Sequence, residues 1–395
     1  MKDKMIKWFE SIYEGSEDVK VYFAPGRVNL IGEHTDYNGG HVFPCALELG
    51  TYGAVRPRKD NVLRFYSMNF SENGVITSSL DEVSHLDDNI HHKKDDWAKY
   101  PKGVLWAFAQ KFKKGLINRG MDILYYGDIP NGSGLSSSAS IEVLTAYIIR
   151  DMFDIDISLK DISLLCQYAE NKYVGVNCGI MDQFAVALGK KDHAILLNTA
   201  SLEYEYAPLK LKNSKIIIAN TNKRRGLEDS KYNERRSECE EALRRLQTVI
   251  NIDTLGDITK EEFEDIKDVI VEDVLIRRAR HAVRENQRTI EAIEALKSDD
   301  MERFGRLMNE SHLSLRDDYE VTGLHLDALV EAAWKQAGLI GARMTGAGFG
   351  GCTVNIVNEN YVEAFIDNVG KIYMDMTGLK ADFYVVESGG GPVIL

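Results

Sequence analysis

Apolar runs broken by turn residues fill the first half of the chain and predict strands there. Residues 19–54 are expected to be extended, with a turn at 24–26, a short strand at 28–31 and a tight turn at 38–40. Residues 121–126 predict a further strand, which a glycine-rich turn follows. The apolar residues beyond that turn recur at helical spacing: Ile141, Leu144, Ile148 and Met152. Strand, loop and helix therefore follow one another at this point.

Charged, helix-periodic sequence dominates the second half. A helix at 161–173 and a buried strand at 194–197 come first, and a buried strand at 215–219 is expected to open a second domain. Residues 232–338 are predicted to be mainly helical. One buried stripe is expected there: Ile276, Ala279, Val283, Ile290 and Ile293. Turn and strand signals return near the end, at 341–357 and 383–386. The pattern predicts an α+β protein in two halves.

The amino-acid composition disfavours some classes of binding partner. The 395 residues carry 48 Lys and Arg against 61 Asp and Glu, a formal net charge of −13, so nucleic acid and anionic membrane surfaces are disfavoured. No apolar run approaches a membrane span, and the first ten residues lack the apolar core of a signal peptide. The five cysteines are widely spaced without a Cys-x-x-Cys pair, which favours reduced thiols. We expect a cytoplasmic globular protein.

The strongest local signal is the glycine- and serine-rich stretch at residues 130–140, between the predicted strand and helix. Its glycines permit backbone N–H groups to turn inward, and the following helix N-terminus favours an anion, so the stretch is suited to binding a polyphosphate. A serine hydroxyl there could also reach Mg²⁺. The alternative is a serine-rich helix cap with a flexible preceding turn, which needs no ligand.

Two standard nucleotide motifs are excluded. No Gly-Lys-Ser/Thr follows the glycines of residues 130–140, so this is not a Walker A loop. Residues 346–351 satisfy G-x-G-x-x-G, but residues 352–357 alternate like a strand, whereas the dinucleotide fingerprint requires a helix at that point. A different nucleotide cradle is therefore indicated.

A second constellation places Arg27, Glu33, His34 and Asp36 within ten residues. Carboxylates accept hydrogen bonds from sugar or polyol hydroxyls, histidine donates or accepts, and arginine offers a fixed cation for a transferring phosphoryl group. The mixture suits a neutral, hydroxyl-rich substrate. A solvated turn is the alternative, and a metal site is disfavoured because the spacing follows no known zinc pattern.

A third candidate is Asp182, an isolated acid among apolar residues and glycine at positions 179–184. Burial would raise its pKa and a nearby cation would lower it. It is either a general base or a helix-capping aspartate.

These stretches and their order resemble the GHMP kinase family. Residues 26–40 read Gly-Arg-Val-Asn-Leu-Ile-Gly-Glu-His-Thr-Asp-Tyr-Asn-Gly-Gly, a highly specific string similar to the signature of the galactose-phosphorylating branch of that family. The other matching stretches span nearly the entire chain: residues 132–140, 179–183, 230–232, 311–321 and 344–352. No motif position departs from the family pattern.

The resemblance implies a two-domain α+β fold with the active site between the domains. Residues 1–212 would form an N-terminal α/β domain similar to a ribosomal-protein fold, and residues 213–395 a ferredoxin-like α+β domain. The implied reaction is transfer of the ATP γ-phosphoryl group to O1 of α-D-galactose, giving galactose 1-phosphate and ADP in galactose catabolism. The implied partners are the sugar, ATP and Mg²⁺, with no nucleic acid or membrane, and the chain is expected to be a monomer.

The resemblance also implies residue roles. Asp182 would be the base near the sugar O1, and Arg27 would polarise that hydroxyl and stabilise transition-state charge. The implied sugar-binding residues are Glu33, His34, Thr35, Asp36, Gly179 and Tyr232. The implied nucleotide-binding residues are Ser67, Gly132, Ser133, Gly134, Leu135, Ser136, Ser137 and Ser138. Ser138 and Glu170 would serve Mg²⁺, and residues 346–350 would close the site between the two halves.

Two other readings remain. One keeps the fold and changes the sugar, for example to N-acetylgalactosamine, because a single pocket residue can admit a 2-acetamido group. The other is a related sensor protein that binds sugar and ATP without turnover. The intact residues 138–140, together with Arg27 and Asp182, favour an active enzyme.

Overall fold

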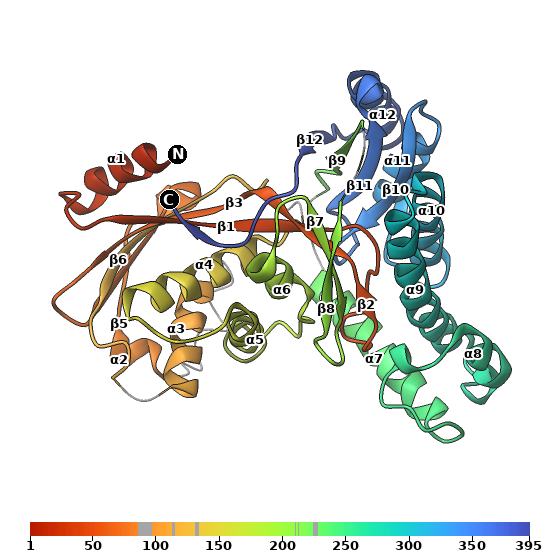
Figure 1. Ribbon diagram of the computed structural model, residues 1–395, viewed down its shortest axis with the longest axis horizontal. Coiled ribbons are helices and arrows are strands. Elements are labelled where there is room, and N and C mark those ends of the chain that lie inside the picture. The colour runs from red at the N-terminus through yellow and green to blue at the C-terminus, as the bar shows by residue number, and fades with distance from the viewer. Residues whose placement is uncertain (86–96, 113–114, 131–133, 210, 212, 224–227) are drawn as a thin grey trace.

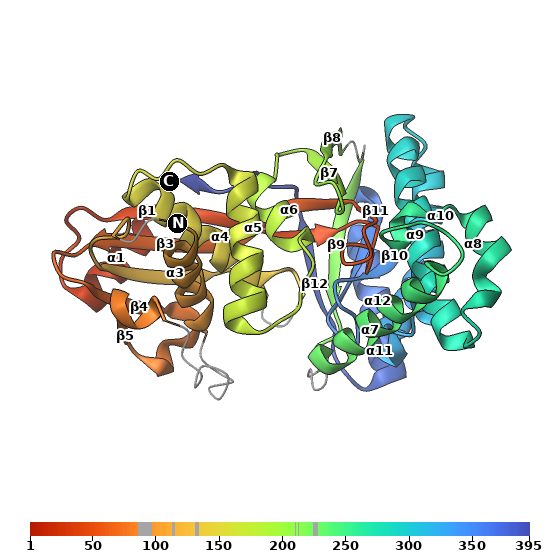
Figure 2. The same cartoon turned by 90° about the horizontal axis from the view of Figure 1, so that it is seen from below.

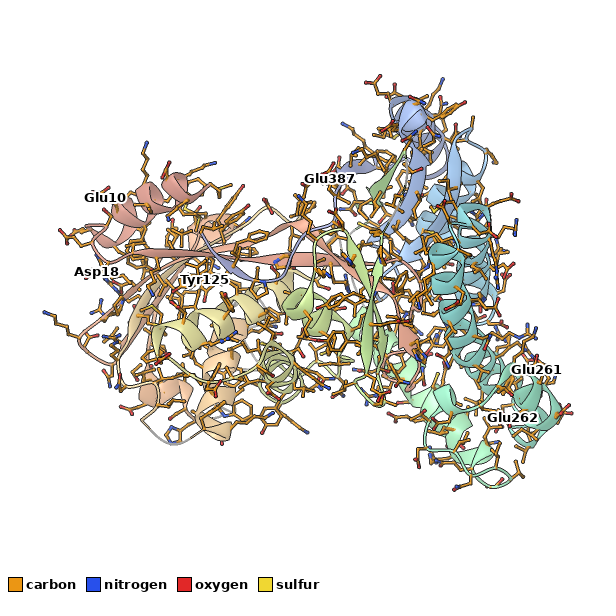
Figure 3. The ribbon with its side chains drawn as sticks, in the orientation of Figure 1. Glu10, Asp18, Tyr125, Glu261, Glu262 and Glu387 are labelled. Carbon is orange, nitrogen blue, oxygen red and sulfur yellow. The ribbon has the colours of Figure 1, made fainter. Side chains whose placement is uncertain are left out.

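The computed structural model describes residues 1–85, 97–112, 115–130, 134–209, 211, 213–223 and 228–395, without the side chains of residues 228 and 229. Figure 1 shows two halves joined side by side, with a long sheet and its helices in one half and a smaller sheet with long helices in the other. The excess negative charge lies partly on exposed acids: Glu10 and Asp18 at one end of the molecule, Glu261 and Glu262 at the other, and Glu387 between them (Figure 3).

The first half is built on a six-stranded sheet. Its strand order is β13-β1-β3-β6-β4-β5, and every neighbouring pair is antiparallel except β4 with β6. The strands are β1 (Lys20–Asn29), β3 (Pro44–Pro57), β4 (Val62–Ser67), β5 (Ile76–Ser79), β6 (Met121–Gly127) and β13 (Val393–Ile394). A separate three-stranded sheet has the order β2-β7-β8, with β2 (His41–Val42), β7 (His193–Asn198) and β8 (Tyr204–Pro208).

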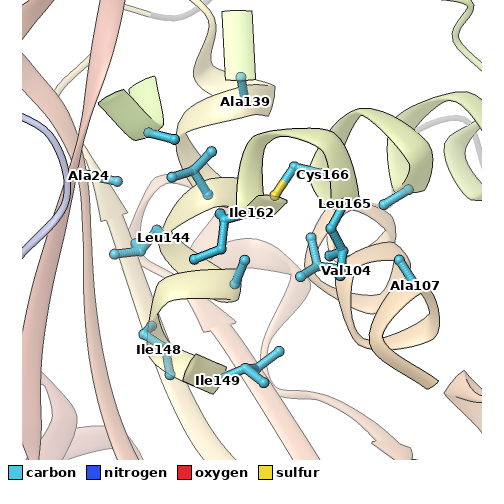
Figure 4. Close-up of a cluster of buried hydrophobic side chains, with 14 of the residues drawn as sticks. Ala24, Val104, Ala107, Ala139, Leu144, Ile148, Ile149, Ile162, Leu165 and Cys166 are labelled. Carbon is cyan, nitrogen blue, oxygen red and sulfur yellow. The ribbon is translucent and has the colours of Figure 1, made fainter. Parts of the chain in front are cut away.

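Helices cover both faces of the long sheet (Figure 1). One face packs on α2 (Leu80–Val83), α3 (Lys99–Lys111), α4 (Ser137–Met152), α5 (Leu159–Ala169) and α6 (Met181–Leu188), while α1 (Lys2–Tyr13) lies on the other. Leu144 and Ile148, two of the predicted apolar positions, are fully buried in this core together with Ala24 and Ile162 (Figure 4). The predicted strand at 121–126 and the helix after it are confirmed as β6 and α4.

The second half contains a four-stranded antiparallel sheet and the longest helices. Its strand order is β10-β11-β9-β12, with β9 (Ser214–Asn220), β10 (Leu339–Thr345), β11 (Cys352–Asn358) and β12 (Asp382–Val386). The helices are α7 (Glu228–Leu246), α8 (Lys260–Ile266), α9 (Asp273–Lys297), α10 (Met301–Asp317), α11 (Gly323–Trp334) and α12 (Val362–Thr377). Short 3-10 segments lie at Met68–Asn73, Leu255–Asp257, Lys267–Val269 and Glu359–Tyr361, and a π-helical turn at Glu170–Val174 extends α5.

The predicted turn at residues 24–26 is wrong, because these residues lie inside β1. The pairing of β1 with β3 shifts register between Pro25 and Arg27. Proline lacks the N–H that a regular ladder needs, and a bulge accommodates it within a strand. At Gly26 a side chain would collide with the carbonyl oxygen of Leu135, 2.8 Å from an ideal Cβ. The strand therefore continues past the proline and delivers Arg27 next to the loop before α4.

The predicted stripe on α9 is only partly right. Ala279, Val283 and Ile293 are buried, but Ile276 and Ile290 are only half-buried. Polar and charged side chains on the same helix are buried instead: Arg278, His281, Glu285, Asn286 and Thr289. The buried face of this helix therefore carries both apolar and polar side chains.

The two halves share one hydrophobic core. Val28 and Phe43 from the first half pack in the same buried cluster as Ile293, Met308 and Val354 from the second. The interface is thus apolar and packed rather than a solvated hinge.

The last residues return to the first half, which sequence did not predict. The strand predicted at 383–386 is β12, but it is not the last: the glycine-rich tail continues to β13, which pairs with β1. Both termini lie at the same end of the long sheet (Figures 1 and 2). Lys2 Nζ donates to the Leu395 backbone oxygen at 2.6 Å.

Candidate active site

Two pockets adjoin where the halves meet, and Ser138 and Tyr100 line both. The first, here the acidic pocket, is lined chiefly by charged and polar side chains, including Arg27, Glu33, His34, Asp36, Lys99, Glu170, Asp182, Tyr232 and Asn233. The second, the aromatic pocket, includes Ser67, Asn69, Phe70, Trp97, Tyr125, Ser137 and Ile141. The predicted site residues from distant parts of the chain therefore converge on one region.

Arg27 and Asp182 form a two-pronged ion pair in the acidic pocket. Arg27 Nε donates to Asp182 Oδ1 at 2.8 Å, and a second guanidinium nitrogen donates to Oδ2 at 2.7 Å. The remaining terminal nitrogen donates to the carbonyl oxygen of Gly134 at 2.7 Å. Arg27 comes from the bulged strand β1 and Asp182 from the first turn of α6. The pair places a fixed cation and a carboxylate beside the glycine- and serine-rich loop, so Asp182 is not a helix cap.

Asp36 lies opposite Gly179, and the two positions depend on each other. A Cβ on Gly179 would fall 1.9 Å from Asp36 Oδ2, so only glycine fits there. Burial, and then the negative charges of Asp182 and Glu33, raise the pKa of Asp36 to about 7. A ligand that donates hydrogen bonds to this carboxylate would stabilise its ionised form.

A cluster of rings lies beside the acidic pocket, which two of them, His34 and Tyr232, line. His34 Nδ1 lies 2.7 Å from the Tyr37 hydroxyl, which lies 2.7 Å from the Tyr319 hydroxyl. The Tyr232 ring is 5.6 Å from His34, centroid to centroid. Burial, and then the neighbouring His281, lower the pKa of His34 to about 3, so its ring is neutral. His34 Nε2 is buried and has no hydrogen-bond partner among the described residues, and His34 lines the pocket, so this nitrogen is suited to meet a ligand hydroxyl.

The glycine-rich stretch at residues 344–352 holds Glu33. Glu33 Oε1 accepts from the Gly346 backbone N–H at 2.9 Å and from the Thr345 hydroxyl at 3.1 Å. Gly346 and Ala347 themselves line the acidic pocket. Because β11 follows this motif, the exclusion of a dinucleotide fingerprint is confirmed. The motif closes the pocket from the second half of the chain.

The glycine- and serine-rich loop is anchored by the site itself. Ser136 Oγ donates to Asp182 Oδ2, and the Leu135 carbonyl accepts from Arg27 N at 3.2 Å. Ser136 has φ of +62°, so the chain turns sharply before α4 begins at Ser137. Ser137 and Ser138 line the aromatic pocket, as does Ser67. Gly132 and Ser133, predicted members of this loop, lie outside the described residues.

Glu170 belongs to a buried acidic cluster behind Ser138. Gln183 Nε2 donates both to Glu170 Oε2 and to Glu142 Oε2, the latter at 3.2 Å. Burial, and then the charge of Asp182, raise the pKa of Glu170 to about 7, while a hydrogen bond from Ser138 opposes this rise. Burial and the nearby Glu170 also raise the pKa of Glu142. A bound cation would reduce the electrostatic repulsion between these carboxyl groups.

Four predicted site residues within the described ranges line neither of these two pockets: Thr35, Gly134, Leu135 and Ser136. Thr35 is buried away from the pocket lining, and its hydroxyl lies 2.7 Å from the His41 carbonyl and 2.9 Å from that of Gly32. It shapes the loop rather than facing a substrate. Sequence reasoning also missed Lys99, Asn233 and Trp97, which line the two pockets, because they lie outside any glycine-rich motif.

The described residues contain neither a helix that could span a membrane nor a cluster of His, Cys, Asp and Glu side chains that could hold a metal ion by itself. None of the helices within the described ranges combines the length and apolar character needed to cross a bilayer. Over this part of the chain, no three or more His, Cys, Asp and Glu side chains are grouped to hold a metal ion by themselves.

Fold and site together define a kinase of the GHMP class. Residues 99–190 match the GHMP kinases N terminal domain and residues 292–374 the GHMP kinases C terminal domain. Residues 7–57 match the galactokinase galactose-binding signature. A galactokinase from Fusobacterium nucleatum subsp. nucleatum is 57% identical over 392 residues, which cover 99% of each chain. This chain belongs to the galactokinase family.

Solved structures agree with this placement. The crystal structure of Lactococcus lactis galactokinase complexed with galactose superposes with a TM-score of 0.95 at 45% identity and covers 100% of both chains. Methanococcus jannaschii mevalonate kinase superposes with a TM-score of 0.65 at 19% identity, covering 95% of this chain and all of the other, which shows the common fold alone. The expected two-domain α+β architecture is confirmed.

Proposed function

We propose that this protein transfers the γ-phosphoryl group of ATP to O1 of α-D-galactose, giving galactose 1-phosphate and ADP. The observation that carries the proposal is the Arg27–Asp182 pair, which lines the acidic pocket and holds the loop that leads to Ser138, a residue at the junction of this pocket with the aromatic pocket. The match to the galactose-binding signature identifies the sugar. Such a junction brings the acceptor hydroxyl and the phosphoryl donor together, which is the main requirement of this reaction.

Phosphoryl transfer proceeds through a loose transition state, so positioning and charge stabilisation dominate catalysis. Arg27 is held by Asp182 and by the Gly134 carbonyl, so its cation is fixed in orientation before substrates arrive. Asp182 Oδ2 already accepts one hydroxyl, that of Ser136. In the complex it accepts the sugar O1–H and takes that proton as the bond to phosphorus forms. Arg27 stabilises the charge that develops on the transferred group.

The sugar is held by groups that match its hydroxyls. Glu33 and Asp36 accept hydrogen bonds from the sugar hydroxyls. His34 Nε2, which has no partner among the described residues, forms another hydrogen bond with a hydroxyl. Gly179 leaves room for the sugar beside Asp36. The Tyr232 ring lines the same pocket. A neutral polyol satisfies these groups without adding charge, which suits the acidic lining.

The nucleotide fits the aromatic pocket. Trp97, Tyr125 and Ile141 offer an apolar setting for a base, while Ser137 and Ser138 stand at the start of the 16-residue helix α4, where backbone N–H groups favour phosphates. Ser138 and Glu170 fit Mg²⁺, which is commonly bound by one or two protein oxygens plus substrate phosphates. When bound, the ion neutralises charge on the β- and γ-phosphates.

Three further features belong to this proposal. The chain divides into domains over residues 1–212 and 213–395, supported by the change of sheet between β8 and β9, while β13 returns to the sheet of the first domain. The protein works as a monomer. It acts in the cytoplasm, where cysteines stay reduced.

The test is ADP release with Mg-ATP across galactose, N-acetylgalactosamine, glucose, arabinose and mevalonate, with the Asp182→Ala variant as the blank. Galactose-dependent ADP release that the blank lacks is the expected result. Preference for N-acetylgalactosamine would replace the proposed substrate and keep the reaction. No turnover with any acceptor, combined with galactose binding in calorimetry, would overturn the kinase in favour of a sensor.

A further inference from the structure

Helix α9 turns a polar face toward the signature loop, although the two lie in different halves of the protein. We define the signature loop as residues 30–40, between β1 and β2, and the polar face of α9 as His281, Glu285, Asn286 and Thr289. All four of these side chains are buried. Their spacing of four, one and three residues places them on one side of a helix. A buried face of this composition is unusual, because apolar residues normally fill such positions.

The polar face holds the backbone of the signature loop. Glu285 Oε1 accepts from the N–H of Gly32 at 3.0 Å and from that of Glu33 at 3.4 Å. His281 Nε2 lies 3.1 Å from the Glu33 carbonyl oxygen, which can only accept, so this nitrogen carries the proton. Both backbone groups of Glu33 are thus fixed by α9. Its side chain is fixed separately by Thr345 and Gly346.

Glu285 is charged in this buried place. Burial would raise its pKa, but Arg288, His281 and Arg343 outweigh burial and lower the pKa to about 2. Arg288 forms an ion pair with Oε2, and the Ser311 hydroxyl donates to Oε1. A buried ion pair is rarely retained for stability alone, because desolvation offsets much of its attraction. Its position against two consecutive loop amides indicates another role.

We propose that Glu285 is a positioning residue that sets the affinity for the sugar without touching it. The inference rests on the proposed function, because it assigns the sugar to the acidic pocket. Glu285 is fully buried and does not line the pocket. It nevertheless holds the backbone N–H groups of Gly32 and Glu33, the two residues directly before His34. Fixing those amides fixes where Glu33, His34 and Asp36 meet the sugar, and a displacement of about 1 Å at such groups is costly.

The experiment compares Glu285→Gln with Glu291→Gln. Both substitutions remove one negative charge from α9, but the Glu291 side chain is 38% exposed, and its partners Arg303 and Gln287 lie at the surface. For Glu285→Gln, the KM for galactose is expected to rise about ten- to hundredfold, because hydrogen bonds to a charged acceptor weaken. The KM for ATP is expected to stay within twofold. Glu291→Gln should leave both constants unchanged.

Calorimetric titration of galactose without ATP gives a second readout. A variant that is merely less stable would lose active protein and lower kcat with both KM values unchanged, whereas lost positioning weakens galactose binding selectively. If Glu285→Gln does not fold, Ser311→Ala removes only the hydroxyl that orients Oε1, and its galactose KM is expected to rise about threefold.

The outcomes separate the two proposals. Wild-type protein that neither binds nor phosphorylates galactose would refute the proposed function. An active wild type with a Glu285→Gln variant whose galactose KM changes less than twofold, or changes as much as its ATP KM, would overturn the inference. An unchanged galactose KM in Ser311→Ala would overturn it if Glu285→Gln cannot be prepared.

Discussion

The acidic pocket and the aromatic pocket adjoin but are built differently. Residues from both halves of the chain line the acidic pocket, and its ionisable groups are held by further buried polar side chains. The described residues of the aromatic pocket all come from the first half, between Thr51 and Ile141, and its lining is dominated by rings, hydroxyls and apolar groups. Hydrogen bonds and ion pairs hold the residues of the acidic pocket in place, whereas the packing of rings and apolar side chains shapes the aromatic pocket.

This difference predicts where selectivity resides. A pocket whose buried polar groups are left unpaired by the wrong ligand rejects that ligand strongly, whereas an apolar pocket distinguishes ligands by shape and by smaller free energies. We therefore expect substitutions at the acidic pocket to change sugar recognition sharply, and substitutions at the aromatic pocket to change nucleotide affinity modestly.

The largest effect is expected from Asp182→Asn in the acidic pocket, because Asp182 also holds the loop that leads to the aromatic pocket. The change keeps the size of the side chain, but removes the charge that orients Arg27 and the acceptor for the O1 proton. We expect kcat to fall about 10²- to 10⁴-fold, while galactose still binds in calorimetry. A kcat within tenfold of wild type would show that Asp182 is not essential to the reaction.

The acidic pocket alone should respond to Gly179→Ala. The new methyl group would meet Asp36 Oδ2, so the loop or the helix start must move. Overpacking of this kind typically costs about 1–3 kcal/mol, so we expect the galactose KM to rise about 5- to 150-fold with the ATP KM unchanged. Gly390→Ala is the control, since its new Cβ meets nothing within 4 Å. Equal effects on both KM values would erase the distinction between the pockets.

The pH dependence of galactose affinity should isolate Asp36. Its pKa is raised to about 7, and only the ionised carboxylate accepts hydrogen bonds from the sugar with both oxygens. Galactose affinity should therefore fall as pH decreases below 7, by up to about tenfold per unit. Calorimetry between pH 5 and 8 measures this slope, and Asp36→Asn should flatten it. A slope that persists in Asp36→Asn would assign the titration to another group.

The same carboxyl affects the stability of the sugar-free protein in the opposite direction. For a carboxyl whose pKa is raised by folding, the contribution to stability is full below the unfolded pKa, near 4, and is lost as pH rises through 7. Asp36→Asn should therefore raise the Tm more at pH 8 than at pH 5. A larger rise at pH 5 would contradict the raised pKa.

The smallest effect is expected in the aromatic pocket. Trp97→Phe removes part of a ring surface that lines the pocket and lies 5.7 Å from the Tyr125 ring, centroid to centroid. A loss of about 1 kcal/mol corresponds to a roughly fivefold rise in the ATP KM, with galactose KM unchanged. If the galactose KM changed as well, the two pockets would be coupled more tightly than their linings indicate.

Local pattern predicted most elements of the fold, but not the groups that support the site. Strand β6, helix α4 and the pocket residues Arg27, Asp36 and Asp182 follow from short-range spacing and motifs. Pro25 was misassigned because a bulge depends on the partner strand. Glu142, Gln183, His281 and Glu285 were missed because helical periodicity treats polar residues as exposed, whereas these face partners that are distant in sequence.

The pairing of β13 with β1 bears on how the protein is made. The inner strand β1 comes from residues 20–29, yet the outer strand β13 beside it comes from residues 393–394. During synthesis, the edge of β1 therefore stays open until residues 393–394 have been made, and an open edge can pair with another chain. Nascent chains on the same mRNA are exposed to mispairing at this edge, and a chaperone that covers it would protect each copy until β13 is in place.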